Sequence, residues 1–265
     1  MNYSFDSLKG ISLLDLTNIW NKCWQGYTFN CTYTPEQMKV WLELGRVALP
    51  SSLVLKVGGQ AAGLALLAVE GTQGWLAGTA IASEFRGHGL FAPLLRKELE
   101  VAMLMGLQRI QLEVLAGNFA QRVYLAAGFR YLRPLYFYRL GGMSLLADKG
   151  SVQGSLRKVS LENYFVARTK SSFIPSWQRR ESCLRRYPGL AAFLEDKQQG
   201  GVLIAGKVVL DAWSVNATGV ADLASSLSRL EGQILRNQPQ DALANFLNTM
   251  GIEPFVIQQE MALDL

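Results

Sequence analysis

Residues 86–91, read Arg86-Gly87-His88-Gly89-Leu90-Phe91, are the segment whose residue types and spacing are best suited to binding chemistry. The segment follows an apolar stretch that ends at Ile81 and precedes a stretch with helical periodicity. Backbone amides at such a helix start converge with the positive end of the helix on an anion, such as a diphosphate. Two glycines in the turn let the backbone approach that anion closely. Taken alone, the pattern is more often a tight strand-to-helix connection that binds nothing.

The elements around this turn follow from the spacing of apolar residues and from turn signals. Thr34 is placed to cap a helix whose first position is Pro35, and Gly128 closes another helix. In the first half we predict helices at residues 13–24, 35–44, 91–105 and 118–127, and strands at residues 52–57, 62–69, 75–81, 109–115 and 129–140.

The second half repeats this organisation in a shortened form. A glycine- and serine-bearing stretch, residues 141–155, predicts a boundary between the halves. Beyond it we predict strands at residues 190–194, 202–205, 208–215 and 252–261, and helices at residues 220–230 and 241–249. We therefore expect two copies of one fold, with a domain at residues 1–142, a linker at 143–158 and a second domain at 159–265.

The turn resembles the Arg/Gln-x-x-Gly-x-Gly/Ala signature of the GNAT superfamily of N-acetyltransferases, and it matches at Arg86 and Gly89. It departs at Phe91, where the family usually has a small residue. The resemblance continues through Leu112-Glu113-Val114, Asn118, Tyr124 and Gly128-Phe129, so it covers residues 75–140. It implies an α/β (α+β) fold in which each domain is a twisted, mixed, mainly antiparallel sheet flanked by helices.

The same resemblance implies a co-substrate, acetyl-CoA, and no metal. In the family the turn binds the pyrophosphate of acetyl-CoA, and the preceding strand pairs through its backbone with the pantetheine arm. The residues that this implies for cofactor binding are Thr79, Ala80, Ile81, Arg86, Gly87, His88, Gly89, Leu90, Phe91, Ala92, Asn118 and Tyr124.

Tyr124 is the candidate general acid, because it lies four residues before Gly128, as the family's tyrosine lies before its Gly-Phe pair. A phenol with a reference pKa near 10 is protonated at neutral pH and can give a proton to a departing thiolate. The alternative is a helix tyrosine that only packs on the core.

Glu113 is the candidate general base, directly or through water, because Leu-Glu-Val on this strand resembles family members in which that glutamate takes a proton. A glutamate in a strand that serves only at the surface or in an ion pair is the alternative. The family commonly has Asn seven residues before the tyrosine, whereas Asn118 precedes Tyr124 by six. Either Gly117 takes the asparagine's place or Asn118 only caps the next helix.

The remaining candidate side chains do not identify the acyl acceptor. His88 is the only histidine, so a Ser-His-Asp or multi-histidine metal mechanism has no support. An aromatic cluster stands where family members often build part of the acceptor site, and core packing explains it equally well. Its members are Trp20, Trp24, Tyr27, Phe29 and Tyr33.

The second copy lacks both features of the first. The strand at residues 208–215 is followed by Asn216-Ala217-Thr218-Gly219-Val220, with no arginine and no paired glycines. Leu247, four residues before Gly251, stands where the first copy has its tyrosine. We expect a degenerate, non-catalytic domain that packs, dimerises or lines the acceptor cleft. Its basic residues around Trp177 are more typical of a solvated helix face than of a ligand site.

Composition favours a soluble cytoplasmic protein. The net charge of +5 is modest for 265 residues, so nucleic acid is not favoured as a partner. Three cysteines without a Cys-x-x-Cys pair indicate neither disulfides nor a zinc site. Residues 1–9 do not read as a signal peptide, and residues 53–69 are too interrupted for a membrane span of about 20 residues.

These observations predict an acetyl-CoA-dependent N-acyltransferase that acts on a primary amine by direct attack. A small-molecule amine is the first expected acceptor class, and a protein amine is the second. The alternative is a non-catalytic acyl-CoA-binding module for regulation or assembly. The sequence also leaves open whether the chain forms a homodimer.

Overall fold

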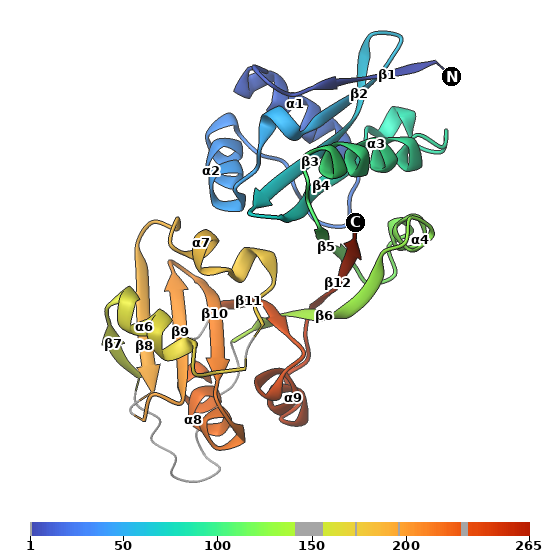
Figure 1. The fold of residues 1–265 in the computed structure, drawn as a ribbon. Helices are drawn as coiled ribbons and strands as arrows, with labels where there is room; N and C mark the ends of the chain where they lie inside the picture. Colours follow the sequence, from blue (N-terminus) through green and yellow to red (C-terminus); the bar gives the residue numbers. More distant parts are fainter. Residues whose placement is uncertain (1, 141–155, 173, 196, 229–232) are drawn as a thin grey trace. The chain divides into compact units, whose positions relative to one another are not determined.

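The computed structural model describes residues 2–140, 156–172, 174–195, 197–228 and 233–265, and the chain divides into two compact units (Figure 1). The first unit is Met1–Tyr131 together with Met261–Leu265, and the second is Leu132–Glu260. The unit boundary thus falls earlier than the expected end of the first domain at residue 142. The expected linker at residues 143–158 lies largely outside the described residues, and its last three residues belong to strand β7 (Leu156–Val159).

The first unit is built on a mixed sheet in the order β1-β2-β3-β4-β5. Neighbouring strands are antiparallel, except that β4 and β5 run parallel. The strands are β1 (Tyr3–Ser7), β2 (Leu53–Val57), β3 (Gln60–Glu70), β4 (Gln73–Ile81) and β5 (Arg109–Leu115). The sequence predicted all of these strands except β1.

Helices cover both faces of this sheet, which explains the continuous apolar run along β3. The helices are α1 (Leu13–Trp24), α2 (Pro35–Gly45), α3 (Phe91–Leu104) and α4 (Ala120–Ala126), with short 3-10 turns at Leu49–Ser51 and Ser83–Phe85. Leu64 and Leu66 of β3 pack in one cluster with α1 and α2, whereas Leu67 packs in another with α3 and α4. The predicted cap at Thr34 is confirmed, since its side chain accepts from the backbone N–H of Gln37.

The second unit repeats this order of elements around a sheet in the order β6-β11-β10-β9-β8-β7. Its remaining strands are β6 (Arg130–Arg139), β8 (Leu190–Glu195), β9 (Gly200–Ala205), β10 (Val208–Ser214) and β11 (Ile234–Pro239). Its helices are α6 (Leu161–Arg168), α7 (Glu181–Leu184), α8 (Ala217–Ser228) and α9 (Ala242–Thr249), with a 3-10 turn at Trp177–Arg179. Strand β11, which the sequence did not predict, completes the repeat.

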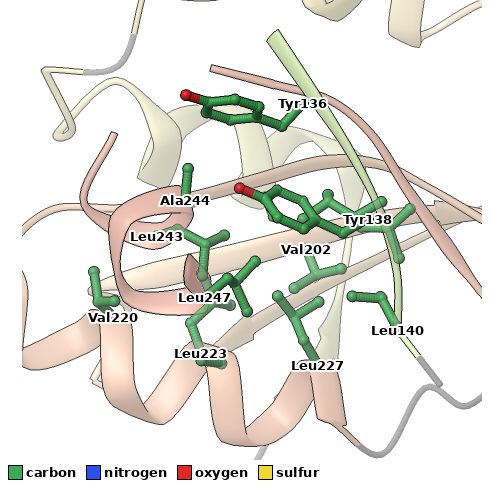
Figure 2. Packing of buried hydrophobic residues seen from close by; sticks show 14 residues of the cluster. Tyr136, Tyr138, Leu140, Val202, Val220, Leu223, Leu227, Leu243, Ala244 and Leu247 are labelled. Atoms are coloured by element: carbon green, nitrogen blue, oxygen red, sulfur yellow. The ribbon is translucent and has the colours of Figure 1, made fainter. Parts of the chain in front are cut away.

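The core of the second unit lies between α8, α9 and the sheet. Figure 2 shows Leu223 and Leu227 of α8 beside Leu243 and Leu247 of α9, with the ring of Tyr138 packed against them. Tyr138 comes from β6, so the strand at the end of the first copy contributes side chains to the core of the second unit.

The prediction of a last strand at residues 252–261 that closes the second copy is wrong in its bounds. The last strand, β12, is Val256–Asp264. Its final residues belong to the first unit. Met261 is fully buried in the cluster of α3, β5 and α4, and the N–H of Leu265 donates to the carbonyl of Gln108 at 2.9 Å. Met261 and Leu263, near the end of β12, therefore pack in the core of the first unit.

Candidate active site

The turn between β4 and α3 exposes backbone amides. Gly87 and Gly89 have φ angles of 79° and 72°, in the left-handed region that favours glycine. A Cβ atom at either position would meet no protein atom within 4 Å. In the described part of the chain, no side chain caps the start of α3. The first amides of the helix and the two glycines therefore form an open place for an anion.

Arg86 holds this turn in place. Its Nε donates to the carbonyl oxygen of Ile81 at 3.1 Å, and its Nη2 donates to that of Cys23 at 2.8 Å. The guanidinium therefore ties the end of β4 to α1. The cofactor role expected for Arg86 stays a prediction, and the structure adds a positioning role beside it.

The other turn residues divide into two sets. His88 and Ala92 are exposed, and Nδ1 of His88 lies 3.3 Å from the carbonyl oxygen of Phe85. Leu90 and Phe91 point into the core instead. The ring of Phe91 lies edge-on to Tyr124, with centroids 5.7 Å apart. The large side chain that departs from the family signature therefore packs inward, and its backbone N–H stays at the helix start.

Strand β4 separates from β5 beside this turn. The two strands pair at Gln73, Gly74 and Trp75, and within the described residues the pairing stops there. The register between β3 and β4 shifts at Ala77, which lies between paired Leu76 and Gly78. Such a bulge removes an amide from the regular ladder, and bulges are common beside active sites. Residues 76–81 thus offer backbone groups on the side facing β5.

Tyr124 lies in α4 with only 6% of its surface exposed. Burial raises the pKa of its phenol far above the ordinary value of 10, and the side chain of Thr79 on β4 lowers it by a smaller amount. The site therefore brings together two of the predicted residues, Thr79 and Tyr124, and keeps the phenol protonated at neutral pH.

Glu113 lies half-buried on β5, where its Oε2 accepts from Nε1 of Trp75 at 2.6 Å. The indole fixes the position of the carboxylate beside the place where β4 and β5 separate. Trp75 itself belongs to a chain of aromatic contacts, with its ring centroid 6.5 Å from that of Trp41. This bond distinguishes Glu113 from a freely solvated surface glutamate.

Asn118 serves the start of α4. Its Oδ1 accepts from the backbone N–H of Ala120 at 2.8 Å, and the N-cap residue of α4 is the next residue, Phe119. It also hydrogen-bonds to the hydroxyl of Tyr27, whose pKa burial raises to about 12. Gly117 has a φ of 78°, which suits the sharp turn before the helix.

Four members of the aromatic cluster, Trp20, Trp24, Tyr27 and Tyr33, form a connected group of ring contacts. Trp20 contacts Trp24, Tyr33 and Trp41, with centroids 5.1, 5.7 and 4.8 Å apart. Trp20 is 3% exposed, whereas Phe29 is 40% exposed. Trp20 thus serves the core, and the acceptor role expected for the cluster remains a prediction.

Glu98 of α3 is a site residue that sequence reasoning missed. It is fully buried, and its Oε2 accepts from the hydroxyl of Thr79 at 2.8 Å. The sequence carries a signal for it, because Glu98 stands on the apolar face of a helix beside Leu94, Leu95 and Leu99. A glutamate on such a face is buried by the fold, and buried carboxyl groups are rare without a partner.

Residues 13–129 match the sequence model of the acetyltransferase (GNAT) family. This segment, and with it the first unit, therefore belongs to the GNAT family. No curated protein sequence matches the chain.

Solved structures match almost the whole chain. A candidate acetyltransferase from Pyrococcus horikoshii is similar at 14% identity with a TM-score of 0.69, covering 100% of this chain and 89% of that one. A tandem GNAT protein from the clavulanic acid biosynthesis pathway is similar at 12% identity with a TM-score of 0.65, covering 99% and 98%. A GCN5-related N-acetyltransferase from Sphaerobacter thermophilus is similar at 13% identity with a TM-score of 0.63, covering 99% and 95%. The predicted fold class, with two GNAT-like domains, is confirmed.

Among the residues that the structure describes, no group of three or more His, Cys, Asp and Glu side chains is placed to hold a metal ion. No described helix is both long and apolar enough to cross a membrane.

Proposed function

We propose that the chain transfers an acetyl group from acetyl-CoA to a primary amine by direct attack. The observation that carries this proposal is the open, uncapped start of α3 behind two left-handed glycines. Open space around both glycines leaves room for a diphosphate where a Cβ would otherwise stand. Membership of the GNAT family supports acyltransferase chemistry for the same unit.

The separated edge of β4 supports a place for the pantetheine arm. An extended chain with amide groups can pair with a free strand edge as an additional strand does. The bulge at Ala77 offers an amide outside the ladder, which can stabilise negative charge on the carbonyl oxygen of the thioester.

Two side chains supply the proton transfers. Glu113, held by Trp75, accepts the proton of the amine directly or through a water molecule. Tyr124 gives a proton to the departing thiolate, and its burial keeps that proton in place until it is needed. The acceptor that we favour is a small-molecule amine or an amino-acid-like metabolite, with a protein N-terminus or lysine second.

The second unit takes a non-catalytic role in this proposal. Leu247 is buried in its core, where the first unit has Tyr124. At the start of its helix α8, Oδ1 of Asn216 accepts from the N–H of Gly219 at 2.9 Å. The unit therefore offers neither the acid nor the open helix start.

Thermal unfolding with and without acetyl-CoA tests the donor site, because a ligand that binds only the folded state raises the midpoint. We expect a rise for the natural protein and its loss in Gly89→Val, whose side chain would fill the open space. Gly59→Val is the matched control, since Gly59 has a φ of 80° and the same open surroundings in a hairpin. Equal acetyl-CoA shifts in the two variants would contradict the proposed turn.

Tyr124→Phe separates the enzyme from the alternative, a non-catalytic acyl-CoA-binding module. Removing a general acid lowers kcat by about 100-fold or more. We therefore expect transfer to the best acceptor of an amine screen to fall by that factor, with the acetyl-CoA shift kept. Tyr138→Phe, which removes another buried hydroxyl, is the control. A natural protein that binds acetyl-CoA and releases no thiol with any amine would favour the module.

A further inference from the structure

Glu98 is a carboxyl group enclosed in the core of the first unit. None of its surface is exposed, and it sits on the apolar face of α3. Its Oε2 has one partner, the hydroxyl of Thr79 at 2.8 Å. Its Oε1 is buried and has no hydrogen-bond partner among the described residues. An ionised carboxylate is costly in such surroundings, because nothing replaces its lost water.

Among the described residues, the groups that face Glu98 include no cation. Thr79 approaches from β4, and Tyr124 approaches from α4 with Tyr27 beyond it. On α3 itself, Lys97 is paired with Glu100 at 2.9 Å and leaves Glu98 alone. Burial therefore raises the pKa of Glu98 from 4.5 to about 8. The group is a neutral carboxylic acid at pH 7.

The phenol of Tyr124 is a poor proton donor by itself, and Glu98 can supply the proton that replaces the one it gives away. Burial raises the pKa of the Tyr124 phenol, and Glu98, once it is ionised, raises that pKa further. A thiol has a reference pKa near 8.5, so a phenol of higher pKa is a poor donor to a thiolate when it must stay ionised afterwards. Proton transfer is most efficient when the pKa values of donor and acceptor are close.

We propose that Glu98 is a buried proton store that acts on Tyr124 through the hydroxyl of Thr79. This inference rests on the proposed function. As the C–S bond of the thioester breaks, the phenol gives its proton to the thiolate, the hydroxyl of Thr79 gives its proton to the phenolic oxygen, and Glu98 gives its proton to Thr79. The thiol leaves neutral, Tyr124 and Thr79 end neutral, and Glu98 ends as a carboxylate. After the thiol has left, Glu98 recovers a proton from water through Tyr124 and Thr79, and Glu113 returns the amine's proton to water, so that no net proton is gained or lost.

The geometry meets the requirement of such a relay. The hydroxyl of Thr79 donates to Glu98 at 2.8 Å and also interacts with the phenol of Tyr124. A hydroxyl can donate and accept at once, so the direction of both bonds can reverse as the proton passes. A glutamate kept only for structure would be better replaced here by an apolar residue, because half of its carboxyl group is unpaired. Glu98 is thus a positioning residue for the acid at Tyr124.

Infrared spectroscopy of the full-length protein tests the store without any acceptor. We expect a protonated carboxyl band at pH 7 that disappears in Glu98→Gln and survives in the control Glu100→Gln. The band should titrate as pH rises through about 8. Thr79→Val and Tyr124→Phe should both shift the band, whereas Thr79→Ser should restore it. Absence of a Glu98 band at pH 7 would overturn the proposal.

Kinetics then test the relay, with thiol release from acetyl-CoA as the readout. We expect Glu98→Gln and Thr79→Val to lower kcat by about tenfold or more, with KM for acetyl-CoA changed by less than about twofold. Thr79→Ser should recover the rate. The fall of kcat above pH 8 in the natural protein should vanish in Glu98→Gln. An unchanged kcat and an unchanged pH profile of kcat in Glu98→Gln would refute the relay. If the natural protein itself shows no acetyl transfer, the proposed function is refuted instead.

Discussion

The two units meet the same structural problem, a strand that turns into a helix, and resolve it differently. In the first unit the turn between β4 and α3 carries two left-handed glycines, and no described side chain caps the helix. In the second unit Asn216 caps α8 through Gly219, and the hydroxyl of Ser214 donates to the carbonyl of Asn216 at 2.8 Å. A Cβ at Gly219 would meet Oγ of Ser214 at 3.0 Å. One helix start is left open for a ligand, and the other is closed by the protein itself.

The two buried carboxyl groups differ in the same sense. Asp211 of β10 accepts from Nε of Arg179 at 2.8 Å and from the hydroxyl of Tyr164 at 2.9 Å, and it is paired with Arg168 at 2.9 Å. Glu98 has one neutral partner, the hydroxyl of Thr79, and its Oε1 has no hydrogen-bond partner among the described residues. Asp211 is thus paired with two guanidinium groups, whereas Glu98 meets a single neutral hydroxyl. Asp211 therefore stabilises the fold of the second unit, whereas Glu98 of the first unit is a buried acid that can exchange a proton.

Removing one partner of the charged network should have the largest effect. Arg179→Met leaves Asp211 with one guanidinium partner, Arg168, and also removes the bonds from Arg179 to Gln238 and to the carbonyl of Ala212. Breaking a buried ion pair on one side costs about 3–5 kcal/mol. We expect that loss in the free energy of unfolding of the second unit, measured in urea. Glu98→Gln should cost far less at pH 7, because the native group is already neutral. Similar losses in both variants would remove the distinction between the two acids.

The pH dependence of stability should follow Glu98. Its folded pKa of about 8 exceeds the ordinary 4.5, so the folded state keeps a proton that the unfolded state loses. The free energy of unfolding should therefore fall as pH rises between these values, by up to about 1.4 kcal/mol per pH unit from this group. In urea unfolding at pH 5 to 8, the free energy of unfolding of Glu98→Gln should rise relative to that of the natural protein as the pH rises. A constant difference would mean that Glu98 does not change its charge in this range.

Local pattern predicted much of this architecture. The helix at residues 13–24 and the strand at 109–115 have the predicted bounds, because their apolar spacing agrees with their packing. Strand β11 carries Arg236, Asn237 and Gln238, which hid its strand character from a search for apolar alternation. The last strand was misplaced because the core that its end enters lies at residues far away in the sequence.

The candidate site was predictable only where a motif exists. The turn and Tyr124 came from family resemblance, and the structure adds contacts that no spacing encodes. Glu98 and Thr79 are 19 residues apart, and only the packing of α3 on β4 brings them together. The inward direction of Phe91 likewise depends on the ring of Tyr124 from another helix.

The smallest effect that we predict concerns the closed helix start. Asn216→Ala removes a capping side chain, and such changes cost about 1 kcal/mol. We expect that loss in the second unit, together with an unchanged thermal shift by acetyl-CoA, since the proposed donor site lies in the first unit. Asn245→Ala, at an exposed position within α9, is the control and should change stability by less than about 0.5 kcal/mol. A loss of the acetyl-CoA shift in Asn216→Ala would mean that the second unit also takes part in binding the donor, and the contrast between an open and a closed helix start would then no longer separate the two units by function.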